Sequence, residues 1–214
     1  MLKLVASVVG AALLVNVNVA SAAKRQFQQE GGLNASVGAS GQLGECETWT
    51  LSSTLSESSI KTEPGAKQVQ NRAILSFFVS NSCDGSFSAF DVDVPDIAKL
   101  TGNLTGASVN LNTPVTVTNC AIVDDNYECT PSTAQLTASL SWSSNGSPVR
   151  FRQHINNLAP DGVRSSIRVE GDSRDSTTTG SLSINGQTYT LTTDNVFTSA
   201  LTSNARMFVV MTRN

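Results

Sequence analysis

Apolar and polar residues alternate along much of this 214-residue chain, and this period of two is typical of half-buried β-strands. The segment 135–144, QLTASLSWSS, places its apolar residues on one face, ending with Trp142, and serine or threonine on the other. The segment 47–55, ETWTLSSTL, alternates in the same way around Trp49 and Leu51. Both segments predict strands, and Trp142 is expected to be largely buried.

Two further segments sharpen this prediction. In NRAILSFFVSNS, 71–82, both faces are apolar around Phe77 and Phe78, which predicts a central strand buried on both sides. In GSLSINGQTYTL, 180–191, Asn185-Gly186 is the favoured pair for a two-residue type I′ hairpin turn. That turn pairs Ile184 with Gln187 and extends the hairpin in both directions.

About eleven short strands with frequent turn signals predict an all-β fold. We expect an antiparallel β-sandwich of Ig-like, Greek-key or jelly-roll type, formed by residues 45–214 as a single domain. The only helical candidate is a turn or two at Asp96–Leu100. Residues 23–44 hold glycine, serine and glutamine with little apolar pattern, which predicts a flexible leader.

The first 22 residues have the pattern of a signal peptide. Lys3 precedes an apolar run of 12 residues, Leu4–Val15, and Ala20-Ser21-Ala22 offers a cleavage site. The alternative is a membrane anchor, but the run is too short to cross about 30 Å of hydrocarbon. We therefore expect a secreted, extracellular or periplasmic protein with no transmembrane segment after signal removal.

The four cysteines suit the oxidising compartment that a signal peptide implies. Of the three pairings that four cysteines allow, we favour Cys46–Cys83 and Cys120–Cys129, because the second pair closes one loop, CAIVDDNYEC. A zinc site is the alternative. It is disfavoured because the chain has no CxxC pair and a single histidine.

Charge is unevenly distributed along the chain. The net charge is −3, and a mildly acidic exported protein is a poor candidate for binding nucleic acid. Residues 26–147 carry 4 basic and 12 acidic residues, whereas residues 148–214 carry 7 arginines and 5 acidic residues. This asymmetry predicts an interaction face near the C-terminus. The alternative is that the arginines only keep the strands soluble.

The segment SPVRFRQHIN, 147–156, holds the only histidine, His154. We expect Val149–Ile155 to form a hairpin with Val163–Glu170, in a register that sets Val149 opposite Val169. The same register places basic residues opposite each other, which suggests a site for an acidic glycan or an acidic protein surface. His154 has no orienting carboxylate on its own strand, so we interpret it as a ligand contact rather than a catalytic base. The candidate ligand-binding residues are Arg150, Arg152, His154, Arg164 and Arg168.

Carboxylates suggest two other kinds of chemistry. Asp124, Asp125 and Glu128 lie within the loop closed by Cys120 and Cys129 and are candidate calcium ligands, with solvated charges as the alternative. Asp91 and Asp93 share one strand face, whereas glycoside hydrolysis requires two carboxyl groups that face each other across a sugar. We therefore predict no catalytic residues, and no cofactor apart from this candidate calcium ion.

These observations favour a secreted, non-catalytic protein that binds a glycan, a cell-surface component or a protein partner. The alternatives are a secreted hydrolase acting on polysaccharide, or a structural component of an envelope or extracellular matrix, and self-association stays open. A flat face with exposed aromatic or arginine side chains would favour binding. A cleft with facing carboxylates would favour the enzyme, and a regular unpaired edge strand would favour assembly.

Overall fold

The computed structural model describes residues 25–62, 68–101, 103–158 and 163–213, so the signal peptide expected at 1–22 lies outside the described residues. Eleven strands form one antiparallel sheet. The strands are β1 (Arg25–Leu43), β2 (Glu47–Thr62), β3 (Gln68–Asn81), β4 (Phe87–Pro95), β5 (Lys99–Leu100), β6 (Gly106–Val123), β7 (Asn126–Ser144), β8 (Val149–Leu158), β9 (Val163–Ile184), β10 (Gln187–Leu191) and β11 (Val196–Arg213). Within these described ranges, no helix is long and apolar enough to cross a membrane.

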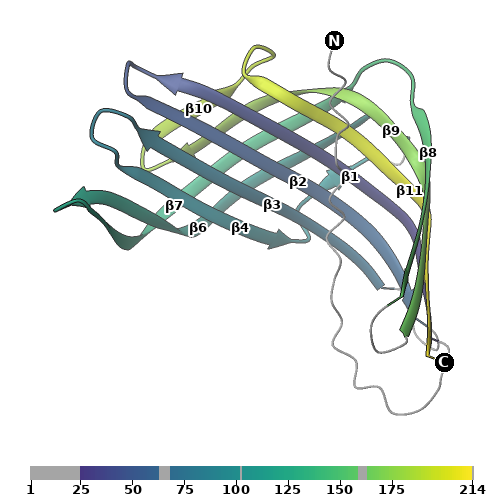
Figure 1. Cartoon of the computed structure of the whole chain (residues 1–214). Coiled ribbons are helices and arrows are strands. Elements are labelled where there is room, and N and C mark those ends of the chain that lie inside the picture. The colour runs from purple at the N-terminus through teal and green to yellow at the C-terminus, as the bar shows by residue number, and fades with distance from the viewer. Residues whose placement is uncertain (1–24, 63–67, 102, 159–162, 214) are drawn as a thin grey trace, which may run out of the picture.

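The sheet closes on itself. Neighbouring strands pair in the order β1, β2, β3, β4, β6 and β7, and β7 pairs with residues 176–184 of β9. Residues 163–175 of β9 pair with β11, which returns to β1. In Figure 1, β1, β2 and β3 lie in front, and β6 and β7 lie behind them. The prediction of an all-β, antiparallel fold is confirmed.

The core lies inside the closed sheet. Trp142 on β7 is 1% exposed, as predicted, and its indole Nε1 donates a hydrogen bond to the carbonyl oxygen of Ser36 on β1 at 3.0 Å. The ring of Tyr189 on β10 packs edge-on against Phe77 and Trp49, with ring centroids 4.7 and 5.9 Å apart. Burial and the nearby charge of Glu47 raise the pKa of Tyr189 above its ordinary value. These contacts join opposite walls of the sheet.

The hairpin around Asn185-Gly186 is confirmed in turn and register. Both residues have positive φ, 52° and 81°, as a type I′ turn requires. Ile184 pairs with Gln187, and Leu182 lies opposite Tyr189. The turn residues and the apolar pattern agree here, so the sequence alone was sufficient to predict this hairpin.

The flexible leader predicted at 23–44 is wrong for its described part, because Arg25–Leu43 forms β1, a 19-residue strand between β2 and β11. None of its buried hydrophobic residues is large: they are Ala35, Val37 and Ala39. A Cβ at Gly41 would lie 2.6 Å from Trp49 Nε1, so glycine leaves room for the indole ring. A strand built from alanine, serine and glycine therefore has the composition of a linker.

Two local predictions are also wrong. Residues 96–100 form no helix: Asp96 has φ 58°, and the Asn71 side chain bonds both the amide nitrogen and the carbonyl oxygen of Ala98, at 2.8 and 2.6 Å. The strand β3 is central, but it is not buried on both faces. Phe77 points into the core, whereas Phe78 lies on the outer face and is 40% exposed.

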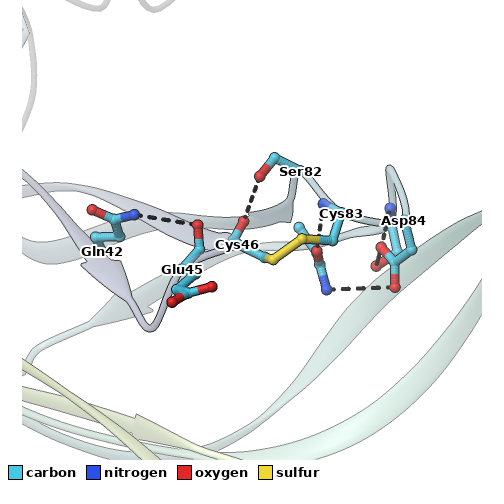
Figure 2. Close-up of a disulfide and its surroundings, with 8 residues drawn as sticks. Gln42, Glu45, Cys46, Ser82, Cys83 and Asp84 are labelled. Atoms are coloured by element: carbon cyan, nitrogen blue, oxygen red, sulfur yellow. Dashed lines mark hydrogen bonds between the residues drawn. A yellow bond between two sulfur atoms is a disulfide. The ribbon is translucent and has the colours of Figure 1, made fainter.

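Both predicted disulfides are present, Cys46–Cys83 and Cys120–Cys129. Figure 2 shows that Cys46–Cys83 joins the turn after β1 to the turn after β3. The Ser82 amide and hydroxyl both donate to the Cys46 carbonyl oxygen, at 2.9 and 3.0 Å. The bridge therefore fixes two neighbouring turns at one end of the sheet.

Candidate ligand-binding surface

The outer face of β11, β1, β2, β3 and β4 carries an open cavity of about 490 Å³, which we call the serine groove. The outward-facing residues that line it are mostly small or hydroxyl-bearing, with two phenylalanines and one carboxylate. They are Ser36, Gly38, Thr50, Ser52, Thr54, Ser76, Phe78, Ala89, Asp91, Phe197 and Thr198.

The floor of the groove is one row of small residues across the sheet. The strand registers align Gly38, Ser52, Ser76 and Asp91 on β1 to β4. Because residues directly opposite each other in a sheet share a face, this row presents hydroxyls and one carboxylate beside one another. The short side chains of this row leave the floor of the groove open.

One wall of the groove is Phe197, which covers Gly38. The β1–β11 register shifts between Gly38 and Ala39, so Phe197 and Thr198 both lie over this part of β1. A Cβ at position 38 would lie 2.6 Å from Phe197 Cε2 and 2.7 Å from Thr198 Cγ2. Glycine is therefore needed for this ring position, in which Phe197 remains 67% exposed.

Phe78, which also lines the groove, begins a line of rings that we call the aromatic strip, formed by Phe78, Phe87 and Tyr127. Ring centroids are 5.5 Å apart for Phe78 and Phe87, and 5.4 Å apart for Phe87 and Tyr127. Tyr127 is 60% exposed. The strip crosses from β3 over β4 to the start of β7, where the Cys120–Cys129 bridge joins β6 and β7. Large rings exposed on β3, β4 and β7 form a surface suited to ligand contact.

The carboxylates near the groove differ in what they already bind. Arg72 Nε donates to Asp93 Oδ1 at 3.1 Å, and this contact raises the pKa of Arg72 above its ordinary value. Asp91, which lines the groove, forms no ion pair within the described part of the chain. Asp91 is therefore the carboxylate with free acceptor capacity for a ligand.

The predicted basic residues lie elsewhere, on β8 and the N-terminal half of β9. The two strands form the expected hairpin, but the predicted register is wrong by four residues. Val149 lies opposite Ser173, and the arginines face acids: Arg150 lies opposite Asp172 and Arg152 opposite Glu170. The observed register pairs opposite charges where the predicted register paired apolar residues. One apolar pair forms in it, Ile155 opposite Ile167.

This register changes the electrostatics of the basic patch. The Glu170 carboxylate pairs with both Arg152 and Arg168, at 2.8 and 2.9 Å. His154 lies opposite Arg168 and its Nε2 lies 3.0 Å from the Ser166 hydroxyl, while Arg164 lies opposite Leu158. The patch is thus brought together on neighbouring strands, but part of its charge is already balanced.

The predicted calcium ligands lie at the tip of the β6–β7 hairpin. Asp124 and Asp125 form the turn, with φ 49° and 63°, and Glu128 lies on β7 opposite Ala121. In the described ranges, no group of three or more His, Cys, Asp or Glu side chains is placed to hold a metal ion. This geometry gives the calcium hypothesis no support.

The sequence did not identify the groove residues as a site. Phe78 was assigned to a strand buried on both faces because it follows Phe77. No sequence pattern singled out Phe197. A usable signal was present, since Phe78 lies between Ser76 and Ser80 on the otherwise mostly polar outer face of β3. No protein-family model, curated protein or solved structure matches this chain. Its function must therefore be inferred from the geometry of the site.

Proposed function

We propose that this protein is an exported, non-catalytic binding protein that holds a neutral glycan in the serine groove. The observation that carries the proposal is that exposed rings and hydrogen-bonding groups line one cavity: Phe78 and Phe197 lie there with Ser52, Ser76 and Asp91. Binding sites for small ligands commonly combine apolar contact area with a few polar groups that orient the ligand.

The chemistry of a sugar ring matches this surface. One face of a pyranose ring presents C–H groups that pack on aromatic rings, and its edge presents hydroxyls. Serine and threonine hydroxyls both donate and accept hydrogen bonds, and a carboxylate accepts two from adjacent sugar hydroxyls. Asp91 and the acidic excess of residues 26–147 favour a neutral glycan over an acidic one.

Two further features support the proposal. The disulfides Cys46–Cys83 and Cys120–Cys129 suit an oxidising compartment outside the cytoplasm. The carboxylates nearest the groove, Asp91 and Asp93, lie on one strand, and Asp93 is held by Arg72. Such an arrangement suits ligand binding better than hydrolysis, which requires two carboxyls on opposite sides of a sugar.

A glycan array of the oxidised protein, with and without calcium, is the first test. We expect saturable binding to neutral oligosaccharides that is insensitive to calcium. Binding should change little between about 0.05 and 0.5 M salt, because screening weakens charge pairs and not ring contacts. Binding that requires acidic glycans and is lost in salt would contradict the groove assignment.

Variants then test the residues. We expect Phe78→Ala, Phe197→Ala and Asp91→Asn each to weaken binding about tenfold, or about 1.4 kcal/mol, by isothermal titration calorimetry. Matched controls are Val149→Ala, an exposed apolar residue on β8, and Asp175→Asn, an exposed carboxylate on β9. If the controls weaken binding as much as the groove variants, the groove is not the site.

A further inference from the structure

The strand β8 has an open edge. This ten-residue strand pairs with β9 and with no other described strand. Figure 1 shows it beside β9, beyond the end of β7. Its second edge therefore presents backbone N–H and C=O groups that an added strand can bind.

The edge is fixed in place and accessible. The Asn145 amide donates to the Asp175 carbonyl oxygen at 2.7 Å, and Arg174 Nε donates to the Gly146 carbonyl oxygen at 2.8 Å, so both bonds hold the approach to β8. Along the strand, Val149 is 69% exposed and Ile155 37%. An incoming segment would meet an ordered strand, which reduces the entropy cost of pairing.

The charge pattern across the sheet indicates what the next strand should carry. In one row of the register, Arg152 on β8 lies opposite Glu170 on β9. This pair joins opposite charges, as favourable cross-strand pairs require. The row ends on a basic residue at the open edge, so the next position favours an acid.

The neighbouring row repeats this pattern, because Arg150 lies opposite Asp172. Arg150, Arg152 and His154 occupy alternate positions, and all three are exposed. Strand β9 therefore places an acidic residue opposite each of the two arginines. An added strand on the other edge would meet the same arginines.

A second copy of β8 meets like charges when it pairs centrally on this edge. Antiparallel pairing of two β8 strands about Arg152 places Arg152 opposite Arg152 and Arg150 opposite His154. Pairing about Gln153 or His154 also places two basic residues opposite each other. Like charges directly opposite in a sheet are unfavourable, so the pattern selects a different partner.

We propose that β8 is a docking edge for an extended acidic segment of another protein, which adds to the sheet as a further strand beside Val149–Leu158. The segment carries Asp or Glu at alternate positions, opposite Arg150 and Arg152, and apolar residues between them, beside Val149 and Ile155. This inference concerns a surface separate from the serine groove and does not depend on glycan binding.

The test uses the full oxidised protein and a ten-residue peptide that alternates glutamate with valine. We expect saturable binding by fluorescence anisotropy and slower amide hydrogen exchange along Val149–Leu158. Two control peptides separate the contribution of charge from that of backbone hydrogen bonds. A peptide with lysine in place of glutamate should bind at least tenfold more weakly, and the acidic peptide N-methylated throughout should not bind, because it cannot donate backbone hydrogen bonds.

Protein variants complete the test. The double variant Arg150→Glu with Arg152→Glu should lose at least tenfold in affinity for the acidic peptide and gain affinity for the lysine peptide. Lys99→Glu, the same charge reversal at an exposed residue of β5, should leave affinity unchanged. If the double variant fails to fold by circular dichroism, Arg150→Gln with Arg152→Gln should still show the loss.

Two results would overturn the proposal. One is equal binding of the N-methylated peptide or of heparin, which would show a general anion surface rather than strand addition. The other is peptide binding without slower exchange in β8.

Discussion

Replacing Trp142 with alanine is expected to lower the free energy of unfolding by about 3–5 kcal/mol, measured by urea denaturation. The indole is 1% exposed inside the closed sheet, so its removal leaves a cavity. It also removes the hydrogen bond from Trp142 Nε1 to the Ser36 carbonyl oxygen, which links β7 to β1. The part-buried Ser36 carbonyl would then lose this donor, which adds to the cost.

Trp142→Phe is the matched control, because it keeps an aromatic ring and removes the donor. Its loss of stability should be smaller, about 1–3 kcal/mol, with part of it from the lost hydrogen bond. A loss below about 1 kcal/mol for Trp142→Ala would mean that the indole does not face the core, and that the register of β7 is wrong by one residue.

Removing the Cys46–Cys83 bridge, by replacing both cysteines with serine, is expected to cost about 4 kcal/mol on the chain-entropy model. The two cysteines are 37 residues apart in sequence, whereas Cys120 and Cys129 are 9 apart. The shorter loop should cost less to lose, about 2.5–3 kcal/mol.

Urea unfolding of the two double-serine variants measures this order directly. The Cys120–Cys129 variant serves as the control, since it removes two cysteines from the same sheet without opening the long loop. A larger loss for Cys120–Cys129 would contradict a stabilisation governed by loop length, and would instead indicate that the bridge holds the aromatic strip in place.

Features governed by local chemistry were predictable from the sequence. The Asn185-Gly186 turn fixed its own register, and the alternation that ends at Trp142 assigned the inner face of β7 correctly. In both cases one short segment contains the determining residues. The disulfide pairing followed from loop size, because Cys120 and Cys129 lie opposite each other on one hairpin.

Features governed by distant neighbours were not predictable. Gly38 and Gly41 on β1 resemble linker residues until Phe197 and Trp49 are placed over them, and those rings come from other strands. Because β1 joins β2 to β11, its place in the sheet was not predicted.

The register of β8 on β9 was mispredicted for a related reason. A register that pairs apolar residues and a register that pairs opposite charges both fit the alternation of these strands. The two differ by four residues, and an even shift keeps every side chain on the same face. The pairing of Arg152 with Glu170 distinguishes them, but that contact appears only once both strands are placed.

The candidate site was the least predictable part. Its residues come from β11 and β1 to β4, and none has unusual neighbours in sequence. The basic residues were predicted as a binding site because they are close together in the chain. The residues of the serine groove come together only through the register of the sheet. Phe78 was hidden by its neighbour Phe77, which does belong to the core.

The most direct measurement is an NMR titration of ¹⁵N-labelled protein with the neutral oligosaccharide that binds best on the array. The groove assignment predicts saturable amide shifts centred on Ser52, Ser76 and Asp91. It also predicts that Phe197→Ala weakens the affinity measured from these shifts. Shifts confined to β8 and the N-terminal half of β9, or no saturable shift with any oligosaccharide, would contradict it.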